Sequence, residues 1–537
     1  MNGNLFAEIF KPERDASVAV MFEQREITYG ELRTQTLKTA EKLNALNLSA
    51  GDRVAILLND SPEFIASFVA VISLGAIAVP INMALRKAEQ MIILKDCSAR
   101  VVIVENQSAP SLFGEENQEN ADLKLLVVTR DGEALAISNI HATRFDLAEQ
   151  RPLAGDSSRS TTPDADAFIL YTSGSTGEPK GAVHSQAHIF YTNETFCREV
   201  LRLREGDRLF SSSRLPFAYG LGNAFTFPLL NGFTTILCRE KPTPEVVSRI
   251  FRDYQPTIFF GVPVVYRMLL EHHRAGLGVP TSVGSSADKS PSEVGTLNTS
   301  SLRLCVSAGE ALPAQLGEDW QRTFGVEVLD GIGSTEMLHM FISNHAGEAR
   351  YGSSGRLVNG YDAKLIDHEG TPVAPGAEGN LWIRGASAAS RYWQRAETSA
   401  HTFVEDWVRT GDLYRQDVDG FWWHMGRSDD CFKPTGQWVS PVEVEGVLLK
   451  TDKLRAAAVV EGLDKDSLSC VCAFVVRANE NDGEELVEQT LRALCESALP
   501  RFKQPRRYIF VSELPYTATG KVQRFKLREQ LRAETRL

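Results

Sequence analysis

The sequence has no apolar run long enough to cross a membrane and nothing that resembles a secretory leader. It contains no stretch of about 20 uninterrupted apolar residues. Residues 1–14 mix charged with apolar side chains and show neither a basic head nor a small-residue cleavage site. These absences predict a protein without a membrane span, and we expect it in the cytoplasm.

Positive charge is also scarce. The 537 residues carry 57 Lys and Arg against 69 Asp and Glu, which gives a formal net charge of -12. A nucleic-acid partner is not expected, because phosphate backbones select proteins with clustered Lys and Arg. Basic residues gather only between Arg501 and Arg536, where they could attract a small polyphosphate or form a solvated helix.

The 8 cysteines form no C-x-x-C pair, so the sequence gives no sign of a zinc ribbon or a thiol–disulfide motif. Cys470 and Cys472 are the closest two, and the alternation of a strand would put both on one face. We interpret the cysteines as buried free thiols.

Short apolar strands alternate with helical or turn signals along most of the chain. Strands are predicted at residues 51–58, 101–105, 123–128, 234–238, 257–263, 302–310 and 326–334, and a helix at 28–46. This alternation is typical of an α/β fold with helix-covered sheets. We predict a large N-terminal domain of several subdomains, residues 1–428, and a small, mobile α+β C-terminal domain, residues 429–537.

A loop rich in glycine and hydroxyl residues, YTSGSTGEPKG at 171–181, directly follows an apolar strand. Its glycines let the backbone approach a ligand, its N–H and hydroxyl groups offer donors to phosphate oxygens, and its lysine adds positive charge. It matches neither the Walker loop nor the dinucleotide G-x-G-x-x-G pattern. A flexible linker is the weaker alternative. The predicted phosphate contacts are Thr172, Ser173, Gly174, Ser175, Thr176, Gly177 and Lys180.

This loop resembles the phosphate loop of the adenylate-forming superfamily, which comprises acyl-CoA synthetases, adenylation domains and luciferases. Further segments match that family's motifs in the same order: DGIGSTEM at 330–337, RTGDL at 409–413, GRSDD at 426–430 and LPYTATGKVQR at 514–524. One such match would be weak evidence, but five in the family's order identify the chain as similar to its members.

The resemblance implies roles for individual residues. Thr335 would contact the α-phosphate of ATP, Glu336 would hold Mg²⁺, and Lys521 would reach the reacting atoms; these are the predicted catalytic residues. Each of them taken alone could equally be an ordinary surface residue. The further nucleotide-binding residues implied are Gly309, Glu310, Asp330, Gly331, Ile332, Asp412 and Arg427.

The resemblance also implies a second step. After the adenylate forms, the C-terminal domain would swing about a hinge near Asp429, remove Lys521 and present another face for CoA. Gly436 would then face the pantetheine channel. Trp438 stands where many CoA ligases of the family have Arg, which puts a phosphate contact there in doubt.

The segment LPFAYGLGNAFTFPL at 215–229 places Tyr219 at the position that lines the acyl pocket in similar proteins. Small neighbours on either side would leave room for a flat ring. Together with FFGVP, SAGEALP and DGIGSTEMLHMF, the segment resembles the benzoate-CoA ligase branch. The predicted substrate contacts are Ala218, Tyr219, Gly220, Ile332, Gly333 and His339. His339 could reach the acid's carboxylate or an ortho substituent, or it could be a packed histidine. Benzoate and 2-aminobenzoate both stay open.

The expected function is an AMP-forming aryl-CoA ligase that uses ATP, Mg²⁺ and CoA and acts as a monomer or homodimer. Three alternatives remain: an enzyme that loads a separate carrier protein, an oxygenase like luciferase, and an inactive nucleotide-binding protein. The last is the least favoured, because the charged and hydroxyl residues of all the motifs are present.

Overall fold

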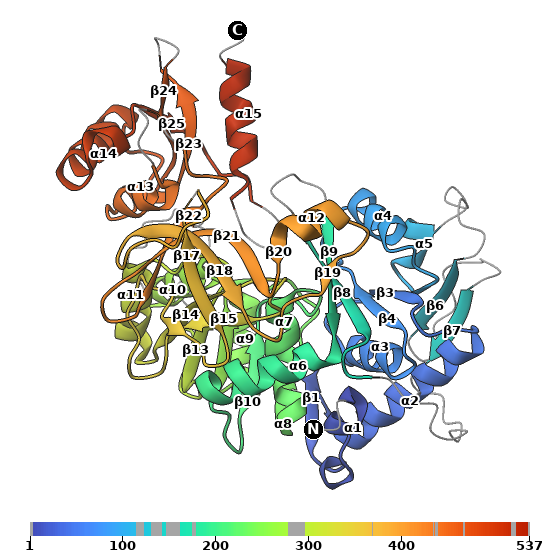
Figure 1. Cartoon of the computed structure of the whole chain (residues 1–537). Helices are drawn as coiled ribbons and strands as arrows, with labels where there is room; N and C mark the ends of the chain where they lie inside the picture. The colour runs from blue at the N-terminus through green and yellow to red at the C-terminus, as the bar shows by residue number, and fades with distance from the viewer. Residues whose placement is uncertain are drawn as a thin grey trace.

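The computed structural model describes residues 4–113, 123–129, 142–146, 162–173, 179–277, 296–367, 369–432, 434, 439–464, 468–516 and 522–534. The fold is α/β, with a large N-terminal domain and a smaller C-terminal domain, as predicted (Figure 1). Each strand and the helix predicted above are present within a few residues of the expected bounds.

The first sheet of the N-terminal domain has nine strands. In spatial order they are β16 (Arg356–Leu357), β15 (Met340–Ser343), β14 (Val328–Gly333), β13 (Leu304–Ser307), β12 (Ile258–Gly261), β10 (Arg208–Ser211), β11 (Thr234–Ile236), β1 (Val18–Phe22) and β2 (Arg25–Thr28). The strands from β14 to β1 are parallel. The carboxyl ends of β12, β13 and β14 therefore share one edge, which is where open α/β sheets bind ligands.

The second sheet has eight strands. In spatial order they are β19 (Arg391–Tyr392), β9 (Pro179–Ser185), β8 (Asp166–Ser173), β4 (Ile77–Pro80), β3 (Arg53–Leu57), β5 (Val101–Glu105), β6 (Lys124–Thr129) and β7 (Ala142–Asp146). The last six are parallel, whereas β8, β9 and β19 pair antiparallel.

Helices α2 (Tyr29–Ala45) and α3 (Pro62–Ser73) share one apolar core with strands of both sheets. Nearly every residue of α3 is buried, as expected of a helix that is apolar all round. The same core takes in α1 (Leu5–Ile9), α6 (Gln186–Thr192), α7 (Ala218–Leu221), α8 (Phe227–Asn231) and the π-helical segment η4 (Gly222–Thr226). The π-helical segment η3 (Asn193–Leu201) continues α6, and the short turn η1 (Pro12–Arg14) follows α1.

Other helices cover the sheets from outside. Residues of α9 (Pro244–Tyr254), α10 (Pro263–Gly276) and α11 (Ala314–Phe324) form a core with the first sheet. Residues of α4 (Lys87–Asp96) and α5 (Ala109–Phe113) do so with the second. The helix-covered sheets that the alternation predicted are thereby confirmed.

A third sheet is antiparallel and shares an apolar core with the first sheet. It contains β17 (Asp362–Ile366), β18 (Glu378–Arg384), β21 (Trp407–Gln416), β20 (Phe403–Val404) and β22 (Trp422–Arg427), with α12 (Ala396–Thr402) just before β20. Its hairpin from β21 to β22 leads into the C-terminal residues.

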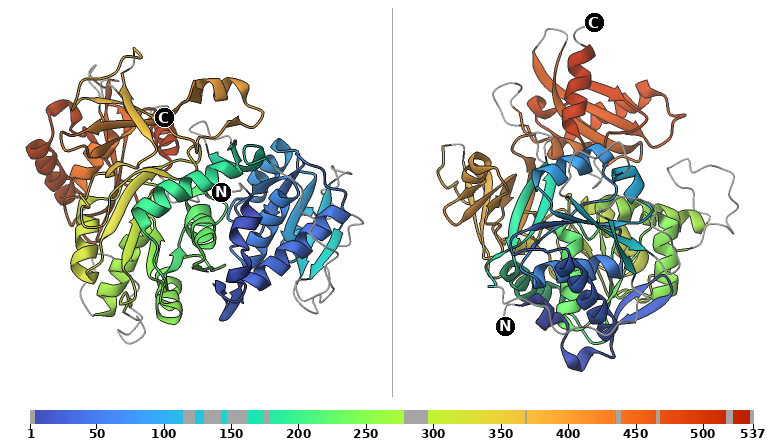
Figure 2. Two further views of the ribbon diagram at one scale, coloured as in Figure 1. Left: turned by 60° about the horizontal axis from the view of Figure 1, so that its bottom comes forward. Right: turned by 90° about the vertical axis from the view of Figure 1, so that its right-hand side faces the viewer.

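The C-terminal residues form a small unit at one end of the larger body, as Figure 2 shows from two further directions. Its sheet consists of β23 (Leu454–Leu463), β24 (Ser469–Arg477) and β25 (Arg507–Phe510). Helices α13 (Pro441–Leu448) and α14 (Glu484–Ala498) pack on one face, α15 (Arg524–Glu534) packs on the other, and the turn η5 (Arg501–Lys503) precedes β25. The domain boundary at 428/429 stays a prediction.

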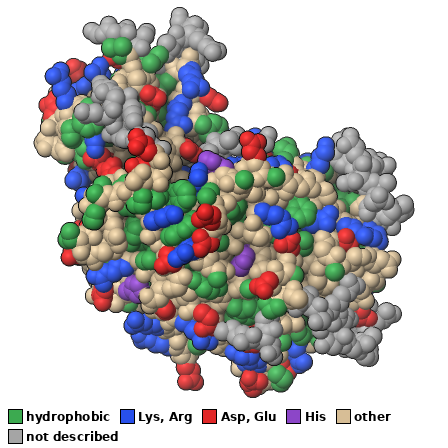
Figure 3. All heavy atoms as spheres, in the orientation of Figure 1, with side chains coloured by type: hydrophobic (Ala, Val, Ile, Leu, Met, Phe, Trp, Pro, Cys, Tyr) green, Lys and Arg blue, Asp and Glu red, His purple; other side chains and the backbone are tan. Residues whose placement is uncertain are grey.

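The structure bears on the predictions about the cysteine pair, the distribution of charge and membrane spans. Cys470 and Cys472 are buried on one face of β24 with their sulfur atoms 3.7 Å apart, as strand alternation predicted. On the face drawn in Figure 3, the described Lys and Arg side chains lie interspersed with Asp and Glu. Within the described ranges, no helix combines the length and the apolarity that crossing a membrane requires.

Candidate active site

The predicted phosphate loop joins two antiparallel strands at the edge of the second sheet. Thr172 at the end of β8 pairs with Lys180 at the start of β9. Tyr171, just before Thr172, donates a hydrogen bond of 2.6 Å to the carboxylate of Asp96 at the end of α4, and Arg395 donates to the same carboxylate at 2.7 Å. The base of the loop is therefore fixed to two other segments of the chain.

Some of the predicted site residues fall outside the described part of the chain. They are Gly174, Ser175, Thr176, Gly177, Gly436 and Lys521, together with the side chain of Ser173. Their assigned roles stay predictions.

The second motif lies in a hairpin of the first sheet. Asp330, Gly331, Ile332 and Gly333 end β14, and Gly333 pairs with Met340 of β15, so Thr335 and Glu336 occupy the turn between the two strands. Ser307 at the end of β13 pairs with Asp330, which brings Gly309 and Glu310 next to the same edge. Gly309 has a φ of +94°, a conformation that favours glycine.

The carboxylate of Glu336 contacts a tyrosine that sequence reasoning missed. The hydroxyl of Tyr392 donates to Glu336 Oε1 at 2.6 Å, and the Nζ atom of Lys180 lies 5.8 Å from the centre of the Tyr392 ring. Burial and the Glu336 carboxylate raise the pKa of Tyr392, while Arg427 opposes that shift. Lys180 and Glu336, which come from two different motifs, therefore both contact one side chain.

A buried histidine holds the main chain of Thr335. His184 of β9 is 1% exposed, and its Nε2 atom lies 2.8 Å from the carbonyl oxygen of Thr335. Burial and then the neighbouring His188 lower the pKa of His184 to about 3, so its ring is neutral and donates to this carbonyl. Strand alternation gave a signal for His184, because residues 180 and 184 lie on the same face of a strand.

The ribose motif forms a pair across the hairpin of β21 and β22. Asp412 faces Arg427 in register, and the Nη1 atom of Arg427 donates to Asp412 Oδ1 at 3.3 Å and to the carbonyl of Thr410 at 2.9 Å. The Asp412 side chain is 11% exposed and the Arg427 side chain 43% exposed. Asp429 follows in the turn after β22.

Two of the predicted acyl residues, Tyr219 and Ile332, pack against the apolar core that η3 shares with the first and third sheets. Tyr219 of α7 donates from its hydroxyl to the carbonyl of Val306 at 3.0 Å, and burial followed by the charge of Asp330 raises its pKa. His339 is 3% exposed, its Nε2 atom lies 3.1 Å from Asn223 Oδ1, and Phe196 and Phe227 pack on its ring. Burial lowers the pKa of His339 to about 3.

The small residues beside Tyr219 are closely packed on the side where a Cβ atom would lie. A Cβ atom on Gly220 would lie 2.1 Å from the carbonyl oxygen of Arg214, and one on Gly222 would lie 2.5 Å from the ring of His339. At both positions the space is filled by protein atoms rather than left open. Ala218 is 9% exposed and belongs to the inner core.

The terminal motif lies in the C-terminal unit, between β25 and the start of α15. Tyr516 and Val522, which flank residues 517–521, form an antiparallel bridge. Burial and then the carboxylate of Glu310 raise the pKa of Tyr516. Arg267 of α10 also donates to the carbonyl of Arg455 at 2.9 Å, so the two domains are in contact.

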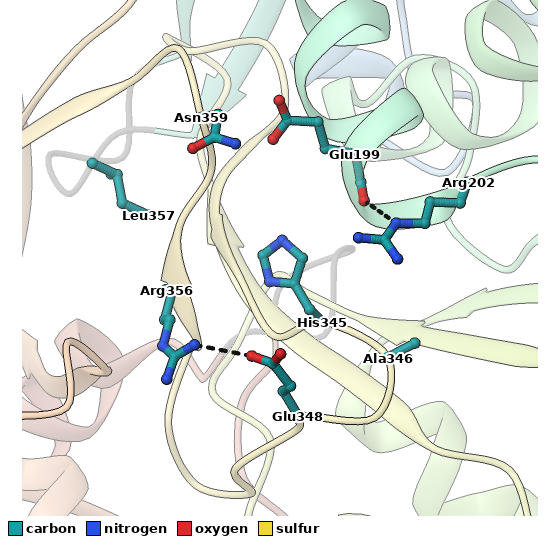
Figure 4. A pocket seen from close by; sticks show the side chains of 8 residues that line it. All are labelled: Glu199, Arg202, His345, Ala346, Glu348, Arg356, Leu357 and Asn359. Carbon is teal, nitrogen blue, oxygen red and sulfur yellow. Dashed lines mark hydrogen bonds and ion pairs between the residues drawn. The ribbon is translucent and has the colours of Figure 1, made fainter.

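A shallow pocket of about 250 Å³ lies away from these residues (Figure 4). It is lined by residues at the end of η3, after β15 and around β16. Arg356 is bonded to Glu348, and the guanidinium of Arg202 is bonded to the carbonyl of Glu199. None of the predicted site residues lines it. Its positive and negative side chains offset one another, so we place no part of the chemistry there.

Comparison with known proteins adds to this geometry. Residues 10–393 match the family model described as AMP-binding enzyme, and residues 443–521 match the AMP-binding enzyme C-terminal domain. The chain belongs to the AMP-binding enzyme family.

Similar proteins within the family act on aromatic acids. The chain is 40% identical to the benzoate–CoA ligase of Thauera aromatica over 503 residues, which cover 93% of this chain and 90% of that protein. It is similar to the crystal structure of the anthranilate CoA ligase AuaEII in complex with anthranoyl-AMP (TM-score 0.89, 35% identity, 100% and 98% of the chains covered). It is also similar to the benzoate CoA ligase of Burkholderia xenovorans LB400 (TM-score 0.83, 36% identity, 98% and 99% covered).

Proposed function

We propose that this chain is an AMP-forming aryl-CoA ligase that converts benzoate or 2-aminobenzoate into an aroyl-adenylate and then into a CoA thioester. The observation that carries the proposal is the cluster around Tyr392. It brings the lysine of the phosphate loop and the acid of the second motif to one side chain, while the arginine of the domain junction pairs with the ribose aspartate. The similarity to benzoate and anthranilate CoA ligases over almost the whole chain supports the same reaction.

The first step joins two anions, because a carboxylate attacks the α-phosphate of ATP and displaces pyrophosphate. The site must offset that charge and keep the attacking oxygen in line with the leaving group. Lys180, Arg427 and Lys521 are the cations that we assign to this task. Asp412 is assigned to the ribose hydroxyls and Thr335 to the α-phosphate, at the turn that β14 and β15 hold in place.

Mg²⁺ is part of the proposal, and the residues present fit it. Oε1 of Glu336 is bonded to Tyr392, and Oε2 has no hydrogen-bond partner among the described residues. The described chain offers no group of three or more metal-ligating side chains. That suits Mg²⁺, which is usually held by one or two carboxylates with substrate phosphates and water. When bound, the ion would supply positive charge to the phosphate oxygens.

For the acid, we assign the pocket to Ala218, Tyr219, Gly220, Ile332, Gly333 and His339. The neutral ring of His339, packed against Phe196 and Phe227, favours the aromatic ring of a substrate over a charged group at this depth. Benzoate and 2-aminobenzoate differ by a single amino group, and we keep both.

For the second step, we propose that the C-terminal domain, residues 429–537, turns about the segment near Asp429 and that CoA then approaches past Gly436. Contacts such as that of Arg267 with Arg455 would have to break in this motion. We further propose a cytoplasmic enzyme that acts as a monomer or homodimer. Transfer to a separate carrier protein is the alternative to transfer to CoA.

The test is pyrophosphate release by the purified protein with ATP, Mg²⁺ and a panel of acids: benzoate, 2-aminobenzoate, hydroxybenzoates, octanoate and acetate, with and without CoA. Aromatic acids should give turnover that depends on CoA. Turnover that ignores CoA would point to carrier loading, and a preference for octanoate or acetate would refute the aryl assignment. Lys521→Ala should abolish pyrophosphate release, whereas Lys526→Ala on the exposed face of α15 should not.

A further inference from the structure

Tyr392 occupies an unusual place between two motifs. It is 6% exposed, and β19, which carries it, pairs with β9 so that Tyr392 faces Ala182. Its hydroxyl donates to Glu336 Oε1 at 2.6 Å, and the N–H of Ala389 nearby donates to the main-chain carbonyl of Glu336 at 2.7 Å. Both the carboxylate and the backbone of Glu336 are therefore held from the same segment.

The ring of Tyr392 has contacts of its own. Lys180 Nζ lies over it at 5.8 Å, within the range of a cation–π contact, and Phe403 packs on it with the ring centres 5.3 Å apart. Hydroxyl and ring thus contact different groups, and substitution can separate their effects.

We propose that Tyr392 is a positioning residue, whose hydroxyl fixes the orientation of Glu336, the residue that would hold Mg²⁺, and whose ring contacts the ammonium of Lys180. The inference rests on the proposed function. Groups that hydrogen-bond to a metal ligand fix its orientation, and losing them typically costs about 10–100-fold in metal affinity or activity. A tyrosine that merely fills the core would have no such effect on the metal.

The experiment measures Mn²⁺ binding to the full-length protein in the presence of ATP, by electron paramagnetic resonance, without any acid substrate. Tyr392→Phe should weaken Mn²⁺ binding about tenfold or more, because Glu336 loses the bond that orients it, while the ring stays over Lys180. Tyr392→Leu removes both contacts and should also weaken the binding of ATP measured without divalent ions. Tyr361→Phe is the matched control, since it removes a buried hydroxyl bonded to Ser387 away from the site and should leave both values unchanged.

A double variant separates a metal role from a structural one. If Tyr392 acts only through Glu336, Tyr392→Phe should cause no further loss of Mn²⁺ affinity in a Glu336→Gln background. If the Phe variant does not fold, Tyr392→His, which keeps a ring donor, should retain part of the affinity.

Wild-type Mn²⁺ affinity in Tyr392→Phe, alongside weak binding in Glu336→Gln, would overturn the inference and leave the proposed function standing. Equal losses in Tyr361→Phe and Tyr392→Phe would also overturn it, because they would indicate a general effect of destabilisation. A wild-type protein that binds Mn²⁺ no better with ATP than without it would overturn both.

Discussion

His184 offers a direct test of how the site is held together. It contacts the main chain of Thr335, a predicted catalytic residue, and is not itself one of the predicted site residues. Its Nε2–H donates to the carbonyl of Thr335 at 2.8 Å, and its ring stacks on Phe168 with centres 5.2 Å apart. His184→Phe removes the donor and keeps an aromatic ring of similar size.

The expected cost follows from the partners of that carbonyl. The N–H of Leu338 also donates to the Thr335 oxygen, at 3.2 Å, so the substitution leaves the oxygen with one hydrogen bond rather than none. The substitution also removes the bond between the Nδ1 atoms of His184 and His188, at 3.0 Å, so the loss should be that of two ordinary hydrogen bonds, about 0.5–1.5 kcal/mol each, without the larger penalty of leaving the Thr335 oxygen unsatisfied. If the bond from His184 to Thr335 stabilises mainly the transition state of adenylation, its loss should slow adenylation by roughly two- to tenfold.

Two measurements separate the possible outcomes. Exchange of labelled pyrophosphate into ATP reports adenylation, and urea unfolding reports stability. His184→Gln, whose amide can donate to the same carbonyl, should recover most of the rate, while Phe168→Leu should reduce stability without a matching loss of rate. Because the pKa of His184 is lowered to about 3, its removal should add or remove no inflection in the rate near neutral pH. Wild-type exchange in a folded His184→Phe protein would refute the reasoning.

Three further predictions concern groups around the site. Burial raises the pKa of Asp330 to about 8, so the carboxyl keeps a proton in the folded protein that it releases near pH ~4 in the unfolded chain. Between these two pH values, the contribution of Asp330 to the free energy of unfolding falls by about 1.4 kcal/mol for each unit by which the pH rises. Asp330→Asn should remove that slope above pH ~6.5, as measured by urea unfolding at several pH values. Arg524→Met breaks a buried ion pair, in which Nη2 of Arg524 lies 2.8 Å from Oε2 of Glu445 and the side chains are 16% and 11% exposed. The change should destabilise the C-terminal unit by about 3–5 kcal/mol, as measured by thermal or urea unfolding. Asp96→Asn weakens the anchor of Tyr171 below the phosphate loop and should cost about 1–3 kcal/mol together with a loss of ATP affinity in calorimetry.

Each of these has its own control. The slope above pH ~6.5 should persist in Asp60→Asn, since burial raises the pKa of Asp60 only to about 6, and a slope that survives in Asp330→Asn would contradict the assignment. For the buried pair, the double change of Arg524 and Glu445 to Met should recover most of the lost stability, because neither charge is then left unpaired. Unaltered ATP affinity in Asp96→Asn would show that the loop does not depend on that anchor.

The sequence alone predicted the elements whose signals are local. Apolar runs and their spacing predicted several strands of both large sheets, among them β3, β5, β6 and β11 to β14. The capping residues of α2 mark its start, where Thr28 and Glu31 bond to each other's main chain. The motifs identified the chain as an aryl-CoA ligase of the adenylate-forming type, and the comparisons confirmed the family. Glu336 and Asp412 were predicted in the same way, since their motifs are contiguous in sequence.

Only the tertiary structure decided which groups meet. Tyr392 and Glu336 are 56 residues apart, and His184 and Thr335 are 151 apart, so no local pattern connects either pair. The structure also showed that a Cβ atom at Gly220 would meet Arg214 and that one at Gly222 would meet His339. A sequence records periodicity and motif because these depend on neighbours along the chain. The packing of β9 and β19 against the turn that carries Glu336 depends instead on how distant strands pair, and that pairing is set by the burial of the whole apolar core.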